Sequence, residues 1–331
     1  MTETTDTRLE AIKHWVETVW QLDNFCIEVA SADASFRRYF RLKSGNDCWI
    51  IMDAPPEKED CQPFIKMAKL IESVGVQAPH IGHINWQQGF MQLSDLGSIA
   101  YLDKLNNETA DSLYIDAIQA IIKMQAIAAD IPVYNAELLI SEMALFSDWY
   151  LQKHLNIALT KVQIKTIAET VELLAVSALQ QGAVFVHRDY HSRNLMITDE
   201  GNPGVIDFQD AVNGPPTYDL VSLIKDCYIA WPRQKQLMWI DQFLALSPLR
   251  INKSLFIKQL DFMGLQRHMK AIGIFARLNH RDDKPNYLKD IPRTLAYVFD
   301  VCQRYDELAH FLALLTALNI QCESETLALI Q

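Results

Sequence analysis

The densest run of polar side chains in this chain spans residues 187–194 and reads His-Arg-Asp-Tyr-His-Ser-Arg-Asn. A further carboxylate follows at Asp207, inside a Val-Ile-Asp-Phe segment. Phosphoryl transfer from a nucleotide needs a carboxylate that orients the acceptor hydroxyl and takes its proton, and oxygen ligands that hold magnesium against the phosphates. Asp189, Asn194 and Asp207 have the side chains for these three tasks.

Apolar segments around this run predict the strands that position it. Residues 183–186 read Ala-Val-Phe-Val and predict a short buried strand that leads into the polar loop. Residues 195–198 and 205–208 predict a hairpin around a Glu-Gly-Asn turn. One loop can therefore present Asp189 and Asn194, and the hairpin returns Asp207 beside them.

Each motif taken alone also has a structural explanation. A lone His-x-Asp could be a salt-bridged turn, and a lone Ile-Asp-Phe could be the capped end of a strand. Here the two motifs occur in order, within a strand–loop–strand–turn–strand pattern. That combination favours the catalytic interpretation over the structural one.

The first part of the chain predicts a small lobe that contains an antiparallel sheet. Apolar spacing predicts an opening helix over residues 9–22. The second and third predicted strands are joined by a short turn, which makes them antiparallel. The predicted strands cover residues 26–29, 39–43, 48–52 and 90–93, an extended segment covers 78–81, and a helix covers 62–73.

A Ser-Asp-Leu-Gly-Ser segment at residues 94–98 is typical of a hinge. We therefore place a small lobe at residues 1–97 and a larger, mainly helical lobe at residues 98–331. Helical spacing in the larger lobe covers residues 114–125, 140–155, 162–179 and most of 218–329. The expected fold class is α+β.

The pattern H-R-D-x-x-x-x-N followed by I-D-F resembles the catalytic and metal-binding loops of protein kinases, and more closely those of the aminoglycoside phosphotransferase family. The resemblance implies a protein-kinase-like two-lobe fold, with ATP and Mg²⁺ as cofactors. It implies that Asp189 is the catalytic base, that Asn194 is a metal ligand and that Asp207 is the main magnesium ligand. His187 would be a structural member of the loop, and Asp219 would brace it.

Several separate segments resemble one bacterial subgroup, the anomeric sugar kinases that act on N-acetylmuramate and N-acetylglucosamine. That subgroup would place the chain in the recycling of cell-wall sugars. The segments that carry this resemblance are residues 30–40, 52–56, 264–268 and 277–279.

Two residues of the kinase pattern are missing from this chain. The third strand ends Ile-Ile-Met-Asp at Asp53, without the lysine that binds the α/β-phosphates in kinases. The helix glutamate that pairs with that lysine also has no equivalent, since alignment puts Phe64 there and leaves Glu72 as the only acidic candidate. The loss of both residues together is chemically coherent, because one buried charge without its partner would destabilise the protein more than the absence of both.

Other side chains must then neutralise the phosphates. The chain has 11 glycines and no glycine-rich phosphate loop, and residues 31–38 occupy the place of that loop. Arg37 and Arg38 lie in this segment, and Arg193 lies next to Asn194. Arginine binds phosphate through two parallel hydrogen bonds, so these three are the candidate nucleotide ligands. The alternative is an ordinary surface arginine beside a strand.

Candidate acceptor-binding residues lie in the predicted helical lobe. Sugar sites combine a few aligned polar groups with an aromatic face. A helix that carries so many polar residues within residues 266–270 is not expected to be wholly buried. The alternatives are that Trp149 is a core residue and that the polar residues within 266–270 form a solvated helix face. The candidates are Trp149, Gln266, Arg267, His268 and Arg277.

Composition excludes several classes of function. The net charge is −11 and no Lys/Arg tract occurs, so neither nucleic acid nor an anionic membrane is an expected partner. Six dispersed cysteines without a C-x-x-C pair do not form a disulfide scaffold or a usual zinc site. The acidic N-terminus lacks a signal-peptide pattern, and the apolar stretch at residues 311–320 is too short for a membrane span. A cytoplasmic location follows as an expectation.

The favoured hypothesis is an ATP-dependent small-molecule kinase for the anomeric hydroxyl of an N-acetylated amino sugar. A kinase for an aminoglycoside, choline or homoserine is the first alternative. The basic segment near Arg267 fits a carboxylate-bearing acceptor better than a cationic aminoglycoside. A nucleotide-binding pseudokinase is a second alternative, and a protein kinase is disfavoured because no A-P-E segment follows Asp207. The oligomeric state is left open.

Overall fold

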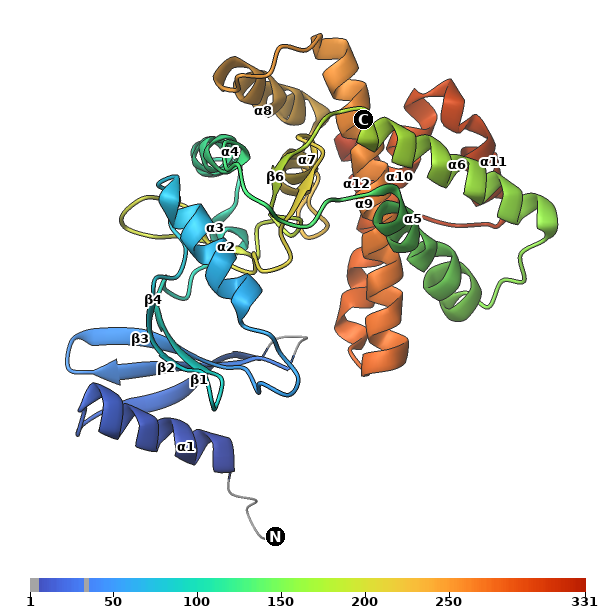
Figure 1. The fold of residues 1–331 in the computed structure, drawn as a ribbon. Helices are drawn as coiled ribbons and strands as arrows, with labels where there is room; N and C mark the ends of the chain where they lie inside the picture. The colour runs from blue at the N-terminus through green and yellow to red at the C-terminus, as the bar shows by residue number, and fades with distance from the viewer. Residues whose placement is uncertain (1–5, 33–35) are drawn as a thin grey trace.

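The computed structural model describes residues 6–32 and 36–331. Its N-terminal part is built on one antiparallel sheet (Figure 1). The sheet has five strands in the order β1-β2-β3-β5-β4. Gly45, with a φ of 60°, lies in the tight turn between β2 and β3, where a residue with a Cβ would be strained. The strands are β1 (Cys26–Ala32), β2 (Arg38–Ser44), β3 (Asp47–Asp53), β4 (Ile81–Asn85) and β5 (Phe90–Ser94).

The two faces of this sheet serve different purposes, because side chains alternate along a strand. On β2, Phe40 joins an apolar cluster with Trp15 of the N-terminal helix. Tyr39 and Arg41 point the other way and line a cavity that faces the helical part of the chain. The N-terminal helix consists of α1 (Thr7–Trp15) and a π-helical continuation, η1 (Val16–Trp20).

Helix α2 (Gln62–Ser73) lies between the sheet and the helical part (Figure 1). The ring of Phe64, buried on α2, packs against the ring of Phe208, with 4.9 Å between their centroids. Glu72 lies near the other end of the helix, where its Oε1 is 3.1 Å from Nδ1 of His80. Phe64 therefore lies where a kinase has its helix glutamate, and it makes an aromatic contact with Phe208, the residue after Asp207.

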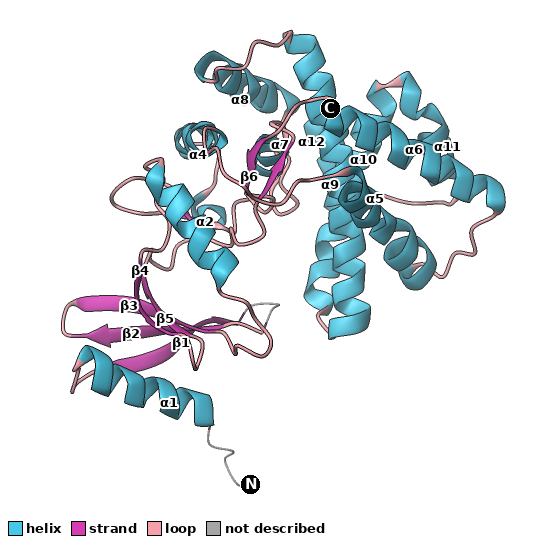
Figure 2. Cartoon of the chain, viewed as in Figure 1, coloured by secondary structure: helices cyan, strands magenta, loops and turns pink. Residues whose placement is uncertain are grey.

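The rest of the chain is mainly helical (Figure 2). Its longest helix, α9 (Lys253–Asp282), has 30 residues, and α5, η2, α6, α7 and α10 pack against it. The α-helices are α3 (Tyr101–Lys104), α4 (Ala110–Gln125), α5 (Ala136–Leu145), α6 (Lys161–Leu179), α7 (Tyr218–Ile224), α8 (Arg233–Leu246), α10 (Ile291–Arg304), α11 (Ala309–Ala317) and α12 (Ser324–Ile330). A π-helix, η2 (Phe146–His154), and two 3₁₀ turns, η3 (Pro285–Asp290) and η4 (Asp306–Leu308), complete this part.

Two short strand pairs lie among these helices. Strand β6 (Val184–Val186) pairs with β9 (Val212–Gly214), and β7 (Leu195–Met196) pairs with β8 (Gly204–Val205), both antiparallel. The predicted strand before the polar loop and the predicted hairpin after it are confirmed, although the hairpin strands are shorter than predicted. Sequence analysis missed β9, because Gly and Pro residues directly after Asn213 signal a turn.

The predicted α+β architecture, with a small antiparallel-sheet lobe and a larger helical lobe, is confirmed. The helix predicted at residues 62–73 is α2, and the one predicted at 114–125 is α4, which begins earlier, at Ala110. Within residues 6–32 and 36–331, none of the helices has the length and apolar character needed to span a bilayer.

Candidate active site

Asp189, Asn194 and Asp207 meet in one cluster. The side-chain amide of Asn194 donates to Oδ2 of Asp207 and to the backbone carbonyl of Asp189, both at 3.0 Å. The β7–β8 hairpin fixes this arrangement, since the backbone N–H of Ile206 donates to the carbonyl of Asn194 at 3.1 Å. The structure therefore brings together the three residues that the sequence singled out.

The backbone at this cluster is strained. Arg188 and Asp207 have positive φ angles, 77° and 65°, although neither is a glycine. Residues held in this region cost free energy, and they persist where the surroundings over-determine them, commonly at functional sites. The strain supports a functional assignment for this loop.

His187 and Asp219 hold the loop at residues 187–194 in place. The buried carboxylate of Asp219 accepts hydrogen bonds from the backbone N–H groups of His187, at 2.7 Å, and Arg188, at 3.1 Å. Nε2 of His187 lies 3.0 Å from the carbonyl of Ile206. Burial lowers the pKa of His187 to about 4, so its imidazole is neutral at pH 7. Both residues occupy the supporting positions that were expected.

Asp189 is ionised although burial opposes its charge. Burial alone would raise the pKa of its carboxyl, but the positive charges of Lys270 and Arg267 and the ring of His191 outweigh it and lower the pKa to about 2. The carboxylate can therefore accept a hydrogen bond from an acceptor hydroxyl across the physiological pH range.

Gln209 is a member of the site that sequence analysis missed. Its Nε2 donates to Oδ1 of Asp207 at 2.9 Å. Its Oε1 is buried and has no hydrogen-bond partner among the described residues. The amide orientation follows from this contact, since the opposite orientation would set two oxygens against each other. Its position two residues after Asp207 was the available signal.

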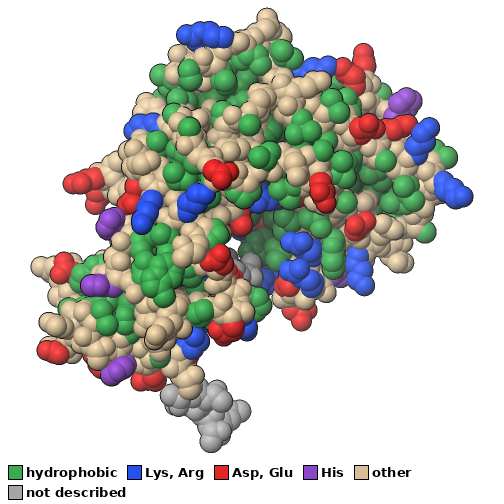
Figure 3. Space-filling model, in the orientation of Figure 1, with side chains coloured by type: hydrophobic (Ala, Val, Ile, Leu, Met, Phe, Trp, Pro, Cys, Tyr) green, Lys and Arg blue, Asp and Glu red, His purple; other side chains and the backbone are tan. Residues whose placement is uncertain are grey.

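The donor set at this cluster fits magnesium. Asn194 and Asp207 offer the amide and carboxylate oxygens that the ion prefers, and the orphaned Oε1 of Gln209 could accept a hydrogen bond from a water on the ion. Asp207 also lines a cavity of about 340 Å³ between the sheet and the helical part. Figure 3 shows the surface hollowed between these two parts.

The three candidate phosphate arginines lie in different places. Arg38 faces the α1 side of the sheet and pairs with Asp6 and with Oδ2 of buried Asp53, at 2.6 Å. Arg37 is buried and pairs with Glu59 at 3.1 Å. Arg193 lines the cavity beside Asp207, with its guanidinium 3.6 Å from the ring centre of Tyr228. The placement of Arg38 does not support a phosphate-binding role. Residues 33–35 of the expected covering loop lie outside the described residues.

Arg41 is a second cation of this cavity that the sequence did not single out. Its Nε donates to Oδ2 of Asp95 at 2.6 Å, and its Nη2 donates to the carbonyl of Gly97 at 2.9 Å. These contacts tie β2 to the segment predicted as a hinge. Because Asp95 neutralises Arg41, this arginine positions the hinge and is not available to phosphate.

Asp189 lies at a second, smaller cavity of about 130 Å³ in the helical part. Asp189 thus borders the smaller cavity, while Asp207, joined to it through Asn194, borders the larger one. This is the arrangement that transfer between two bound molecules requires. The residues that line the smaller cavity include Asp189, His191, Tyr228, Arg267, Lys270 and Tyr287.

The polar cluster of α9 is buried, contrary to expectation. Gln266 and His268 are 0% exposed, Arg267 is 6% exposed and Lys270 is 8% exposed. Nε2 of His268 lies 2.9 Å from the carbonyl of Lys225, and its ring stacks on Tyr297. Sequence analysis could not see these contacts, because elements far apart in the chain supply the partners.

The predicted acceptor residues therefore separate into two groups. Arg267 lines the cavity that contains Asp189, whereas His268 and Gln266 do not. Gln266 instead donates to the hydroxyl of Tyr134 at 3.1 Å. Trp149 packs against the apolar core, and Arg277 does not line this cavity either.

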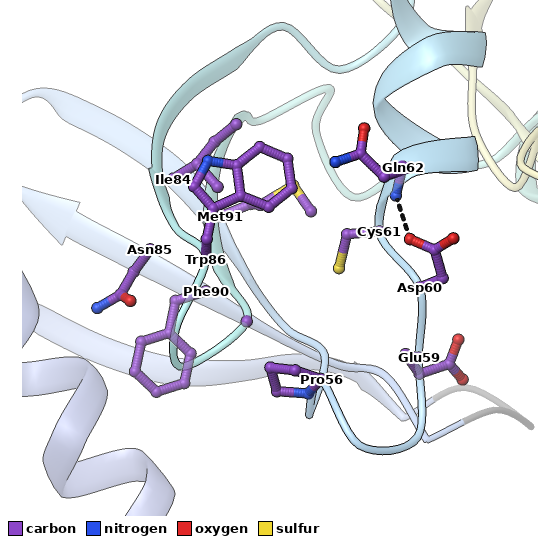
Figure 4. Close-up of a pocket in the computed structure, with 11 residues that line it drawn as sticks. Pro56, Glu59, Asp60, Cys61, Gln62, Ile84, Asn85, Trp86, Phe90 and Met91 are labelled. Atoms are coloured by element: carbon purple, nitrogen blue, oxygen red, sulfur yellow. Dashed lines mark hydrogen bonds between the residues drawn. The ribbon is translucent and has the colours of Figure 1, made fainter.

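A third cavity, of about 270 Å³, lies in the small lobe (Figure 4). It is bordered by the β4–β5 turn at Trp86 and by the segment that leads into α2. Asp60 gives this cavity negative charge, which disfavours phosphate, while Glu59 is paired with Arg37. Asp189, Asn194 and Asp207 do not line it.

The fold and the site define a phosphotransferase of the two-lobe kinase class. The chain belongs to the phosphotransferase enzyme family, whose model matches residues 27–248. It resembles solved structures of this class at low identity. A spectinomycin phosphotransferase in complex with ADP and spectinomycin superposes with a TM-score of 0.64 at 10% identity, over 89% of this chain and 98% of that one.

Further comparisons agree on the fold and are more specific in sequence. An ADP-bound aminoglycoside phosphotransferase gives a TM-score of 0.59 at 16% identity, over 87% of this chain and 97% of that one. The N-acetylmuramate/N-acetylglucosamine kinase of Pseudomonas aeruginosa is 45% identical over 296 residues, which cover 87% of each chain. The protein of the same name from Pseudomonas putida is 41% identical, over 95% of this chain and 97% of that one.

Proposed function

We propose that this protein is an ATP-dependent kinase that phosphorylates the anomeric hydroxyl of an N-acetylated amino sugar. The observation that carries the proposal is the position of Asp189, which borders the small cavity and is joined through Asn194 to the predicted metal ligand Asp207. The names of relatives at 45% and 41% identity support N-acetylmuramate and N-acetylglucosamine as acceptors. An activity that consumes ATP is consistent with a cytoplasmic location.

The residues have the following tasks in the proposed reaction. Asn194 and Asp207 would hold magnesium, which offsets the negative charge of the nucleotide phosphates when bound. Asp189 accepts a hydrogen bond from the acceptor hydroxyl and takes its proton as the new O–P bond forms and ADP leaves. Asp219 and His187 keep the loop in the conformation that aims Asp189 into the acceptor cavity.

Arg193 is the best-supported partner for the nucleotide phosphates. Of the two arginines that line the larger cavity, Arg41 is ion-paired with Asp95, whereas Arg193 forms no ion pair with a described carboxylate. Replacing Arg193 by methionine should raise the KM for ATP roughly tenfold or more, by loss of a charge-assisted hydrogen bond. Arg38→Met is the matched control, and an equal effect of both variants would contradict the assignment.

The proposed function is tested by following ADP release from Mg-ATP with a panel of acceptors. The panel contains N-acetylmuramate, N-acetylglucosamine, an aminoglycoside, choline and homoserine. We expect turnover with the two amino sugars and none with the others. Tight nucleotide binding without turnover of any acceptor would favour a pseudokinase and overturn the proposal.

A further inference from the structure

We infer that Arg267 binds a carboxylate of the acceptor and makes the protein prefer N-acetylmuramate, which carries a lactyl carboxylate, over neutral N-acetylglucosamine. The inference rests on the proposed function and adds to it the side chain that discriminates between the two sugars.

The first observation is a buried charge without a counter-ion in contact. Arg267 is only 6% exposed and lines the cavity that contains Asp189. Its hydrogen bond runs from Nη1 to Sγ of Cys227, at 3.6 Å, and it forms no ion pair with a carboxylate of the described residues. Burial opposes the charge of Arg267, and the carboxylates of Asp226 and Asp189 raise its pKa from beyond contact distance, so the guanidinium can still gain from an anionic ligand in direct contact.

The second observation is that the other cation in this cavity already has a carboxylate in contact, which it shares with Arg188. Nζ of Lys270 lies 3.2 Å from Oε1 of Glu142 and 3.3 Å from the hydroxyl of Tyr218. Arg188, which precedes Asp189, also pairs with Glu142. Arg267 is therefore the cavity-lining cation with capacity for a new carboxylate.

The third observation is the charge balance at the reacting end of the cavity. Asp189 places a carboxyl group in the lining of this cavity, and its negative charge would repel an anion that enters beside it. An acceptor that carries a carboxylate therefore needs a cation in the same cavity, and Arg267 supplies one. The aromatic rings of Tyr228, Phe275 and Tyr287 complete the lining and suit the apolar faces of a sugar ring.

Arg267 is also held rigidly enough to select between acceptors. It lies in the middle of α9, where its neighbours His268 and Gln266 are anchored by contacts to Lys225 and Tyr134. Side chains on a packed helix keep their position better than those on a loop. The guanidinium can therefore present two parallel donors to a carboxylate without first ordering a mobile segment.

The test compares three acceptors with three proteins. The acceptors are N-acetylmuramate, its neutral methyl ester and N-acetylglucosamine, and the proteins are wild type, Arg267→Met and Arg267→Lys. We expect wild type to favour the acid over the ester by roughly 10- to 100-fold in kcat/KM. Arg267→Met should abolish that ratio, and Arg267→Lys should restore part of it, because lysine keeps the charge without the planar fork.

Arg277→Met is the matched control, since it removes a guanidinium from the same helix outside this cavity. It should leave the acid-to-ester ratio unchanged. An equal kcat/KM of wild type for acid and ester, or an Arg267→Met variant that loses activity equally with all three acceptors, would overturn the inference. If wild type turned over none of the three acceptors, the proposed function itself would be overturned, and the inference with it.

Discussion

At the scale of single residues, the protein keeps a carboxylate charged where burial opposes charge. Asp189 owes its ionisation to Lys270, His191 and Arg267, which surround it in the acceptor cavity. The low pKa makes Asp189 a weak base. In the proposed reaction its main contribution is therefore to orient the hydroxyl and to accept its proton late, as expected for a loose phosphoryl-transfer transition state.

Asp189→Asn should lower kcat by roughly 10²- to 10⁴-fold, because asparagine keeps the shape but cannot take the proton. The affinity for Mg-ATP should change little, since Asp189 faces the acceptor cavity and not the larger one. Steady-state ADP release and nucleotide titration by calorimetry measure the two quantities. Retention of most of the activity would remove Asp189 from its assigned role.

Gln209 provides a second prediction for a single residue. Its Nε2 orients Asp207 through a 2.9 Å hydrogen bond. Its Oε1 is buried and has no hydrogen-bond partner among the described residues. Gln209→Leu should weaken divalent-metal binding by roughly 10- to 100-fold, as for other residues that hold a metal ligand in place. Titration of Mn²⁺ into the protein in the presence of ADP, followed by electron paramagnetic resonance, measures this affinity without turnover. Unchanged Mn²⁺ affinity would show that Gln209 is only a packing residue.

The sequence predicted the catalytic cluster well and the acceptor site poorly, for a physical reason. Asp189, Asn194 and Asp207 lie on one loop and one hairpin, so short-range rules bring them together. Arg267 and His268 are neighbours in sequence, yet one borders the cavity and the other is in the core. Their surroundings come from α7 and α10, which local sequence cannot specify.

At the scale of elements, helix α9 organises the acceptor side of the molecule. It carries Arg267 and Lys270 and packs against α5, η2, α6, α7 and α10. Gly273 allows this packing, because a Cβ there would collide with the backbone of Leu145. Gly264 is less restricted, since its Cβ would lie 2.9 Å from the side chain of Val221.

Gly273→Ala should therefore destabilise the protein by about 1–3 kcal/mol, the usual cost of overpacking a core. Gly264→Ala is the matched control, since it adds the same methyl group to the same helix and meets a side chain instead of backbone. Its cost should be smaller, because the side chain of Val221 can move aside, whereas the backbone of Leu145 cannot. The gain in helix propensity, roughly 1 kcal/mol for alanine over glycine, is the same in both variants. Urea denaturation ranks the two variants. A Gly264→Ala variant that is less stable than Gly273→Ala would contradict this account of α9.

Element types were predictable from sequence, and their limits were less so. The apolar residues of β2 and β3 around a short turn, and the spacing of α2, predicted those elements within a few residues. Strand β9 has three residues and depends on pairing with β6, so its own sequence carries little signal. The π-helical continuation at Phe146–His154 likewise follows from packing against α9.

At the scale of the whole molecule, buried neutral histidines couple folding to pH. Burial lowers the pKa of His187 to about 4 and that of His268 to about 3, below the ordinary value of 6.5. Each of these histidines therefore binds more protons in the unfolded chain than in the folded one between about pH 4 and 6.5. Their contribution to the free energy of unfolding should fall as pH falls through this window, whereas Asp219, whose pKa burial raises to about 7, contributes in the opposite direction.

Each of these histidines should contribute a slope of about 1.4 kcal/mol per pH unit near pH 5. His268→Gln should reduce the total slope by about that amount, whatever its effect on the stability at pH 7. His310→Gln is the control, since His310 is exposed and water solvates it in both states. Urea denaturation between pH 5.0 and 6.5 measures the slopes, and an unchanged slope in His268→Gln would contradict this assignment.

In the proposed function, each of the two cavities binds one of the two substrates. The larger cavity lies between the sheet and the helical part and contains Asp207 and Arg193, while the smaller contains Asp189 and Arg267. The contact between Phe64 and Phe208 joins α2 to the predicted metal-binding segment without the charged pair of protein kinases. The separation of the cavities, bridged through Asn194, is the whole-molecule basis of the proposed transfer.

The position of phosphate on the product tests the central claim most directly. N-acetylglucosamine and its methyl glycoside, in which the anomeric oxygen is blocked, are incubated with Mg-ATP and followed by phosphorus NMR. We predict a sugar 1-phosphate from the free sugar, no product from the glycoside and almost none from either with Asp189→Asn. Phosphorylation of the methyl glycoside, or undiminished product formation by Asp189→Asn, would contradict the account.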